Sequence, residues 1–309
     1  MTKKVTLVTG GAGFIGTHLA SYLGKQGRSV VVLDDLSSGS RQNLQQLKVT
    51  AELIEKDIAD PAALESLKNY GIDTIYHLAS QANVPLSVRQ PVTDFDTNMR
   101  GTLNVLEFAR AQGAQVIFPS TVSVYSKDSV KPIPETASIH ASSPYGAAKA
   151  GGENYCYAYA NCYGVRTVVA RLFNVYGPLM NKYVIYDFVR KLQANPREMD
   201  IIGNGRQTRD YTYVEDAVRA LVLLSEKGES GTAYNLGNGE PVRIIDLARL
   251  ISEEMGLTGV KFNCTNQEAV GDISEWYADL TRLRSLGYKP ETSFREGLRR
   301  TVQYIVGTK

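Results

Sequence analysis

A tyrosine and a lysine stand four positions apart in the run SPYGAAKAG, residues 143–151. Residues four apart on a helix share one face, so Tyr145 and Lys149 can point into a single site. A tyrosine near its ordinary pKa of about 10 is a poor base at neutral pH, but a nearby ammonium favours the phenolate and lowers that pKa. With 18 tyrosines and 15 lysines in 309 residues, chance alone gives about one Tyr-x-x-x-Lys match, so an ordinary helix that carries both residues is the alternative.

A glycine-rich turn near the N-terminus supplies context for this pair. The run VTGGAGFIG contains Gly11-x-Gly13-x-x-Gly16, and Gly10 adds a second spacing, Gly-x-x-Gly-x-x-Gly. Such glycines allow a tight strand-to-helix turn and the close approach of a pyrophosphate to a helix N-terminus. Asp34 follows at the end of the second expected strand, where a carboxylate bonds the ribose hydroxyls of adenosine. The sequence therefore predicts a dinucleotide site, with a plain glycine turn and a solvated aspartate as the alternative.

The charges beside this site favour NAD over NADP. Asp35 would repel the 2′-phosphate that distinguishes NADP, whereas Arg41 acts in the opposite direction. We therefore expect NAD as the cofactor.

Strand and helix patterns alternate through the first half of the chain. Runs rich in buried, β-branched residues predict strands at residues 4–10, 29–35, 51–57, 73–79, 114–120 and 166–172. Helices are predicted at about 14–26, from Pro61 onward, at 93–112, and from Ser143-Pro144 to about Tyr163. This alternation predicts an α/β fold, a Rossmann-type doubly wound parallel sheet with helices on both faces.

The pattern loosens after about residue 177. Residues 193–214 indicate turns, one short strand and a polar loop, and the tail from Arg243 indicates two or three helices with a short strand at 260–264. A helix near 214–226 and a strand at 232–237 are expected to return to the main sheet. We predict an NAD-binding Rossmann domain over residues 1–176, to which about 214–237 returns, and a smaller mixed α/β C-terminal substrate domain over 177–309.

The composition is typical of a globular protein, with 43% hydrophobic and 21% charged residues. A net charge of +2 gives no reason to expect nucleic acid or a membrane surface as a partner. Neither a signal peptide nor a membrane-spanning helix is predicted. The three cysteines, Cys156, Cys162 and Cys264, are an odd number without metal-type spacing, which indicates free thiols and a cytoplasmic location. The three histidines, His18, His77 and His140, are far apart in the sequence, so no metal site is expected.

The glycine pattern together with Tyr145-x-x-x-Lys149 resembles the extended short-chain dehydrogenase/reductases. More narrowly, it resembles the NAD-dependent sugar-nucleotide epimerase/dehydratase family, over nearly the whole chain. EKDIAD is similar to the family's adenine-contacting turn, YHLASQANVPLSV to the segment that lines NAD and the sugar, and NMRGTLNVLEFA to the helix with a cofactor-side asparagine. The cofactor-binding residues implied by the resemblance are Gly10, Gly13, Phe14, Ile15, Gly16, Asp34, Asp57, Ile58, Leu78, Ala79, Asn98, Tyr145 and Lys149.

The resemblance also implies the catalytic residues. In PSTVSVYS, Thr121 matches the family's active-site Ser/Thr position, where it would share a hydrogen bond with the reacting sugar hydroxyl alongside Tyr145 and Lys149. Family dehydratases carry Asp-Glu directly after this threonine and decarboxylases keep the glutamate, but here Val122 and Ser123 cannot do that acid–base work. The implied reaction is therefore 4-epimerisation of a nucleotide sugar, by hydride removal and return through a transient 4-keto sugar.

For the substrate, RLFNVYGP resembles the family's sugar-nucleotide-contacting turn and GNGRQTRDYTYVEDAV its diphosphate-binding loop. The substrate-binding residues implied are Ser87, Thr121, Ser123, Tyr145, Asn174, Arg209, Asp272 and Trp276.

Two positions bear on which nucleotide sugar is bound. Ala269 stands where the family usually has an arginine three residues before the ribose-contacting Asp272, so one phosphate contact is missing or comes from Arg206 or Lys182. Trp276 matches the family's gate for the sugar 2-substituent, and its bulk favours UDP-glucose and UDP-galactose over N-acetylated sugars, unless Trp276 packs in a core instead.

Three alternatives stay open. The enzyme could act as an epimerase or 4-ketoreductase on another nucleotide sugar, such as a UDP-N-acetylhexosamine, a UDP-uronate or a CDP-, GDP- or dTDP-sugar. The chain could instead be a non-catalytic NAD-binding protein. Tyr155, Tyr159 and Tyr163 recur at helical spacing, and the resemblance implies a homodimer through this helix and the one at 93–112, with core packing as the alternative.

Overall fold

The computed structural model describes residues 5–267 and 275–308, and the chain divides into two compact units. Unit 1 comprises residues 1–129, 136–172 and 218–234. Unit 2 comprises residues 130–135, 173–217 and 235–309. Each unit is described below by itself.

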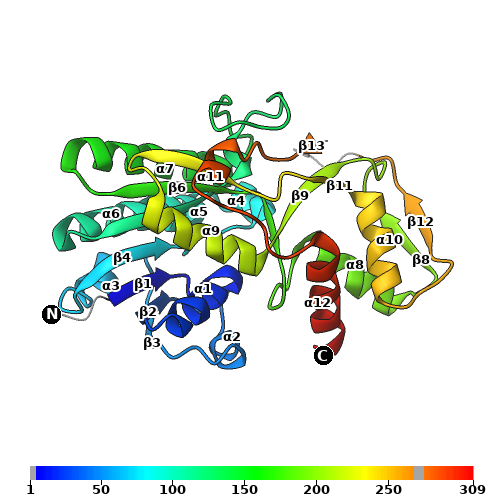
Figure 1. The fold of residues 1–309 in the computed structure, drawn as a ribbon, viewed down its shortest axis with the longest axis horizontal. Coiled ribbons are helices and arrows are strands. Elements are labelled where there is room, and N and C mark those ends of the chain that lie inside the picture. The colour runs from blue at the N-terminus through cyan, green and yellow to red at the C-terminus, as the bar shows by residue number, and fades with distance from the viewer. Residues whose placement is uncertain (1–4, 268–274, 309) are drawn as a thin grey trace. The chain divides into compact units, whose positions relative to one another are not determined.

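Unit 1 is built on a seven-stranded sheet with the strand order β10-β6-β5-β4-β1-β2-β3, in which neighbouring strands from β1 to β6 run parallel (Figure 1). The strands are β1 (Val5–Thr9), β2 (Ser29–Asp34), β3 (Glu52–Glu55), β4 (Ile72–His77), β5 (Gln115–Thr121), β6 (Thr167–Leu172) and β10 (Thr232–Leu236). The chain order reverses between β1 and β4. In doubly wound sheets the carboxyl ends of the strands at such a point form the ligand crevice.

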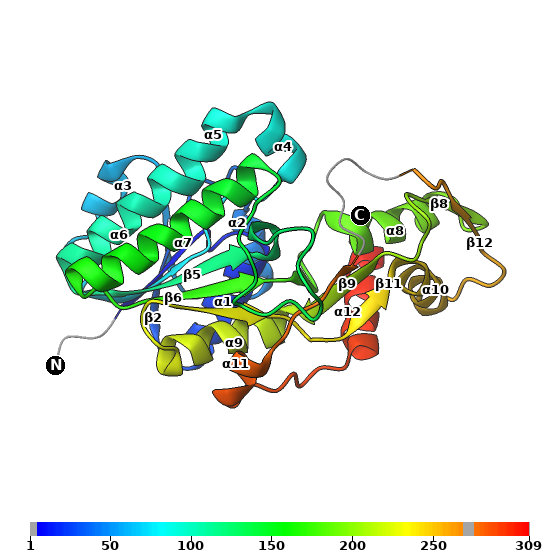
Figure 2. The same ribbon diagram turned by 90° about the horizontal axis from the view of Figure 1, so that it is seen from above.

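Helices cover both faces of this sheet, as predicted. In Figure 2, α3, α6 and α7 lie over one face, and α1 and α9 lie over the other. The helices are α1 (Phe14–Lys25), α2 (Arg41–Gln46), α3 (Pro61–Glu65), α4 (Val84–Arg89), α5 (Pro91–Phe95), α6 (Gly101–Gln112), α7 (Pro144–Tyr163) and α9 (Val214–Lys227, in unit 1 from Val218). The Rossmann-type α/β fold is confirmed.

The helix that carries the Tyr-Lys pair has well-defined ends. The Ser143 side chain accepts a hydrogen bond from the Gly146 backbone N–H at 3.1 Å, and Pro144 occupies the first turn. Gly164 ends the helix in the left-handed region, with a φ of 68° that a side chain would disfavour. These signals define a long α7, as predicted.

The prediction of one unbroken helix over residues 93–112 is wrong. Instead of a single helix over 93–112, the chain forms α5, a π-helical turn η1 (Asp96–Arg100) and then α6. A π-turn inserts one extra residue into the helical ladder and re-aims the side chains around it. Here the inserted turn carries Asn98, which is buried. Periodicity over the whole stretch does not detect such an insertion.

The described part of unit 2 contains two small sheets and four helices that lie wholly within it. In one sheet β9 (Thr208–Tyr213) pairs with β7 (Asn174–Tyr176), β11 (Pro241–Arg243) and β13 (Glu275–Trp276); in the other β8 (Glu198–Ile201) pairs with β12 (Lys261–Cys264). The helices are α8 (Tyr183–Ala194), α10 (Ile244–Glu254), α11 (Thr281–Ser285) and α12 (Phe294–Gly307). The expectation of one short strand and a polar loop at 193–214 is wrong, because both β8 and β9 form there.

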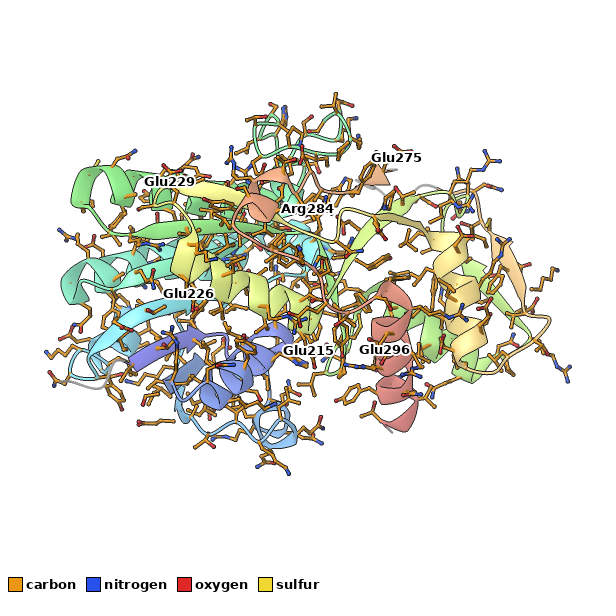
Figure 3. All side chains as sticks on the ribbon, in the orientation of Figure 1. Glu215, Glu226, Glu229, Glu275, Arg284 and Glu296 are labelled. Carbon is orange, nitrogen blue, oxygen red and sulfur yellow. The ribbon has the colours of Figure 1, made fainter. Side chains whose placement is uncertain are left out.

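The core of unit 2 lies between its longer helices and β9. Helices α8, α10 and α12 pack against one another, and edge-on or stacked rings join β7, β9 and α12 through Tyr176, Tyr211, Tyr213 and Phe294. At the surface, Arg300 pairs with Glu296 at 2.7 Å and with Glu215 at 3.8 Å; Figure 3 labels both carboxylates. The core thus fixes β9, which carries Arg209.

Candidate active site

The glycine turn between β1 and α1 is packed too tightly for side chains. A Cβ on Gly10, whose φ is +67°, would lie 2.5 Å from the backbone N of Ala79, and a Cβ on Gly16 would lie 2.1 Å from the Gly10 carbonyl oxygen. Gly13 begins α1 without a side-chain cap. The turn therefore lies against Leu78 and Ala79 at the end of β4, and the first N–H groups of α1 are left for an anion such as a pyrophosphate.

Asp34 at the end of β2 braces this turn. Its carboxylate accepts hydrogen bonds from the backbone N–H groups of Ala12 at 2.9 Å and Leu36 at 2.8 Å. The side chain is buried, and this burial raises the pKa of the carboxyl group, with the backbone donors opposing the shift. Arg41, the residue that could favour NADP, forms an ion pair with Glu55. The carboxylate position thus fits an adenosine ribose.

The predicted adenine-side turn is held by a residue that the sequence analysis missed. The Asn104 amide donates hydrogen bonds to the carbonyl oxygens of Ile58 at 3.0 Å and Ala59 at 3.1 Å. The Asp57 carboxylate accepts from the Ala59 N–H at 2.8 Å, and Gly101 at the start of α6 leaves no room for a Cβ beside Ile58. An asparagine one turn into a helix gives no sequence signal for such a contact.

Asn98 on the π-turn uses both ends of its amide to hold the loop after β4. Its carbonyl oxygen accepts from the Ser80 hydroxyl at 2.7 Å and the Gln81 N–H at 3.1 Å. Its amide N–H groups donate to the Gln81 carbonyl oxygen and to Asp94, both at 3.0 Å. The structure therefore assigns Asn98 a role in positioning residues 80–81, beside Leu78 and Ala79. Phe14 and Ile15, at the start of α1, are partly buried.

Thr121 and Tyr145 lie on segments that are in contact. Thr121 ends β5 and is buried, and its hydroxyl caps the short turn η2 (Val122–Val124) by accepting from the Ser123 N–H at 3.2 Å. A Cβ on Gly146 would lie only 2.5 Å from the Ser123 carbonyl oxygen. The first turn of α7, which carries Tyr145, therefore packs directly against the segment that carries Thr121.

Lys149 is one helical turn beyond Tyr145 and is 2% exposed. Its ammonium lies 4.1 Å from the centre of the Phe118 ring, a cation–π contact. Burial lowers the pKa of this lysine to about 8, while the charges of Cys156, Glu153 and Asp94 act to raise it. Among the described residues no hydrogen-bond acceptor is found for the ammonium. A buried ammonium with unused N–H donors fits a ligand hydroxyl, such as one of a nucleotide ribose.

His77, which lies beside Lys149 and Phe118, does not act as a base. His77 exchanges hydrogen bonds with the hydroxyls of Thr9 at 2.8 Å and Thr102 at 3.0 Å. Burial, and secondarily the charge of Lys149, lowers the pKa of His77 to about 3. The ring is therefore neutral at physiological pH and packs behind Phe118.

Two predicted substrate residues of unit 1 differ in their environment. Ser87 is fully buried, and its hydroxyl donates to the Val84 carbonyl oxygen of its own helix at 2.7 Å. Ser123 is partly buried, beside Thr121. Of the two, Ser123 is the one adjacent to Thr121 and to the first turn of α7.

Three predicted substrate residues come together in unit 2. Arg209 and Trp276 are register partners in the parallel pairing of β9 with β13, and the guanidinium carbon lies 6.0 Å from the indole centre. Asn174, on the neighbouring β7, donates to the Asp210 carbonyl oxygen at 3.3 Å. Asp272, and the Ala269 position, lie outside the described residues.

Asp210 is a second residue that the sequence analysis missed. Its fully buried carboxylate accepts from the backbone N–H groups of Asn238 at 2.7 Å, Gly239 at 2.9 Å and Ala278 at 3.1 Å. Burial raises the pKa of Asp210 to about 6, against the effect of these donors. Asp210 thus ties the chain that follows Trp276 to β9. In the sequence, the only sign of this role was an acidic residue directly after Arg209, the arginine expected to bind the diphosphate.

Within the described ranges, no group of three histidine, cysteine, aspartate or glutamate residues is arranged to hold a metal ion. No helix in the same ranges is both long and apolar enough to cross a membrane.

Comparison with known proteins agrees with this geometry. The model of the "NAD dependent epimerase/dehydratase family" matches residues 6–237. UDP-glucuronic acid decarboxylase 1 of Xenopus tropicalis is 35% identical, over 98% of this chain and 72% of its own length. The structure of the UDP-glucose 4-epimerase of Thermotoga maritima with UDP-glucose is 37% identical, with a TM-score of 0.92 and coverage of 98% and 99% of the two chains.

A third neighbour widens the range of substrates among these relatives. The UDP-N-acetylglucosamine 4-epimerase of Methanobrevibacter ruminantium, solved with UDP-N-acetylmuramic acid, is 31% identical, with a TM-score of 0.92 and complete coverage of both chains. All three relatives carry names of enzymes that act on nucleotide sugars. This chain belongs to the NAD-dependent epimerase/dehydratase family, with NAD as its cofactor.

Proposed function

We propose that this enzyme catalyses the 4-epimerisation of a nucleotide sugar, with UDP-glucose and UDP-galactose as its most favoured pair. The observation that carries the proposal is the composition of the site around Thr121. Tyr145, assisted by the charge of Lys149, can exchange a proton with the sugar 4-hydroxyl. The turn after Thr121 holds Val122 and Ser123, which cannot act as acids or bases at carbon 5. Such a site supports removal and return of a hydride without a further elimination or decarboxylation.

The residues divide the work as follows. Tyr145 accepts the proton of the sugar 4-hydroxyl, while the Thr121 hydroxyl forms a hydrogen bond with the same oxygen. Lys149 favours the phenolate of Tyr145 by its charge and donates to a ribose hydroxyl of the cofactor. Bound NAD supplies the hydride acceptor and donor. After the 4-keto sugar turns over, Tyr145 returns the proton, so that no net oxidation occurs.

Decarboxylation of a UDP-uronate is the second candidate, because the Xenopus relative carries that name. That reaction also passes through a 4-keto sugar, so the same three residues could begin it. The absence of a carboxylate at positions 122 and 123 is the observation against it.

We infer that residues 1–176, with the return at about 214–237, bind NAD, and that residues 177–309 bind the nucleotide sugar. Arg209 on β9 donates hydrogen bonds to the diphosphate of the substrate. The Trp276 indole beside it limits the space for a substituent at carbon 2 of the sugar. Asp272 is proposed to reach the nucleotide ribose by the family resemblance alone.

We propose a homodimer for the same enzyme, through the face formed by α4, α5 and α7. Val88, Val92 and Phe95 are 62%, 72% and 53% exposed, and Tyr155 on the adjacent α7 is 41% exposed. Exposed apolar side chains on helices that contact one another favour an interface with a second copy. We further propose a cytoplasmic location, which the free thiols of Cys156, Cys162 and Cys264 favour.

The proposal is tested by incubating the protein, without added cofactor, with UDP-galactose, UDP-N-acetylgalactosamine and UDP-glucuronic acid in separate samples. NMR of the anomeric protons follows each reaction. Conversion of UDP-galactose alone to UDP-glucose supports the epimerase with the Trp276 gate, and conversion of both galacto sugars discards the gate. Formation of UDP-xylose from the third sugar would contradict the epimerase proposal, as would a need for added NADH.

A further inference from the structure

A buried ion pair lies directly beneath the proposed catalytic residues of unit 1. Glu153 on α7 is 0% exposed and Arg171 on β6 is 3% exposed. The guanidinium binds the carboxylate with two parallel contacts, Nε to Oε1 at 3.0 Å and Nη2 to Oε2 at 2.7 Å. Removing two charges from water this completely is costly unless every remaining donor and acceptor finds a partner.

Hydroxyl groups extend the pair to three further points. The Ser120 hydroxyl donates to Oε1 of Glu153 at 2.5 Å. Nη1 of Arg171 donates to the Tyr125 hydroxyl at 2.9 Å, and the Tyr157 hydroxyl donates to Oε2 of Glu153 at 3.2 Å. The network therefore joins β5, β6, α7 and the chain that leaves η2.

The attachment points bracket the catalytic set. Ser120 immediately precedes Thr121, and Tyr125 follows the turn that Thr121 caps. On the other side, Glu153 is one helical turn beyond Lys149 and so lies on the same face of α7. Glu153 thus links the end of β5, through Ser120, to the face of α7 that carries Tyr145 and Lys149, and Arg171 extends this link to Tyr125.

We propose that the Glu153–Arg171 pair is the positioning device of this site, which holds Thr121 in register with Tyr145 and Lys149. The inference rests on the proposed function for the reaction, but the geometry it describes exists without substrate. Glu153 and Arg171 act through their neighbours, so they are positioning residues and not catalytic ones.

The hydroxyl groups allow a test that leaves both charges in place. Tyr125→Phe removes the hydroxyl that accepts from Nη1 of Arg171, and Ser120→Ala removes the hydroxyl that donates to Oε1 of Glu153. Each variant should keep NAD and an unchanged KM but lose about tenfold in kcat, because a small displacement of a reacting group is costly. Tyr76→Phe is the matched control: Tyr76 is equally buried, and its hydroxyl donates to Ser225 at 2.7 Å on the opposite side of the sheet.

The charges provide a readout that a merely structural role would not move. The titratable groups that interact electrostatically with Lys149 are Glu153, Cys156, Asp94 and His77. The carboxylate of Glu153 raises the pKa of Lys149, so Glu153→Gln should move the alkaline limb of the kcat profile to lower pH. Arg171→Met leaves that carboxylate without its cation, so it should raise the pKa of Lys149 further and move the limb to higher pH.

The experiment is decided by three measurements on the holoenzyme: kcat and KM, the pH profile, and the Thr121 methyl signal in protein labelled with ¹³C-methyl threonine. A shifted Thr121 signal and a reduced kcat in Tyr125→Phe, with neither in Tyr76→Phe, support the proposal. A wild-type kcat and an unmoved signal in both Tyr125→Phe and Ser120→Ala would overturn it while the epimerase proposal stands. If the wild-type protein is inactive on every nucleotide sugar, the proposed function is wrong. The Thr121 methyl signal of the variants, compared with that of the wild type, still decides the positioning role.

Discussion

At the scale of single residues, the proposed chemistry depends on one proton acceptor, the Tyr145 hydroxyl. Replacing tyrosine with phenylalanine removes that oxygen and leaves the ring, so Tyr145→Phe should reduce kcat by about 10²–10⁴-fold. NAD should stay bound, because the glycine turn and Asp34 are untouched. The measurement is turnover of UDP-galactose together with the NAD content of the purified variant.

The control for this substitution is Tyr70→Phe, since the Tyr70 hydroxyl donates to Glu52 at 2.8 Å, away from the site. Its activity should equal that of the wild type. Substantial turnover by Tyr145→Phe would contradict the mechanism, and loss of NAD would show that the variant had damaged the cofactor site instead.

The pH dependence is set at the same scale by Lys149. Burial lowers the pKa of this lysine to about 8, so the ammonium that favours the Tyr145 phenolate is lost as the pH rises through that value. We expect kcat/KM for UDP-galactose to fall on the alkaline side with an apparent pKa near 8. A flat profile from pH 7 to pH 10 would show that the charge of Lys149 does not contribute to the rate.

At the scale of elements, the contact between α7 and the end of β5 determines where Tyr145 lies. Gly146→Ala would place a Cβ 2.5 Å from the backbone carbonyl of Ser123, which cannot rotate away. The turn must shift, at a cost of about 1–3 kcal/mol in the free energy of unfolding. We therefore expect a large loss of kcat in steady-state kinetics, together with the lower stability in urea unfolding.

Gly151→Ala is the matched control on the same helix. Its added Cβ would meet only the side chain of Met99, which is flexible and can move. This variant should retain both activity and stability. Equal effects of the two substitutions would show that the contact with Ser123 does not position Tyr145.

Those elements of the fold that depend on a short local sequence pattern could be predicted from the sequence. The strand-glycine-helix pattern gave the first βα unit, and the Ser143-Pro144 start and Gly164 end gave α7, all of which the structure confirms. The π-turn before α6 and the strand β9 were missed. A π-turn changes the ladder by one residue, and β9 is polar in its first half and is stabilised as a strand by three partners distant in the sequence.

In the site, too, contacts between neighbours in the sequence could be predicted, whereas contacts between distant residues could not. The spacing of Tyr145 and Lys149 was informative because a helix fixes neighbours four apart. Glu153 obeys the same spacing, but its partner Arg171 lies on another strand, and Asp210 binds backbone N–H groups of two separate segments. Such contacts depend on the folded register, which a single sequence does not contain.

At the scale of the whole molecule, the exposed apolar face of α4, α5 and α7 predicts the association of two chains. Phe95→Glu should convert the dimer to a monomer, because a charge buried at such an interface lacks a partner. Ile202→Glu, at an equally exposed apolar position of unit 2, should leave the dimer intact. Light scattering coupled to size exclusion measures both masses; a monomeric wild type would contradict the proposed dimer.

The position of β10 has a consequence for how the chain is made. This strand closes the sheet beside β6, yet most of the residues between the two strands belong to unit 2 or to α9. During synthesis, β6 therefore leaves the ribosome well before its neighbour and presents an unpaired, apolar edge in the meantime. Nascent chains that stop short of Thr232 should consequently aggregate or recruit chaperones, and slow translation through residues 173–231 should lower the yield of active enzyme.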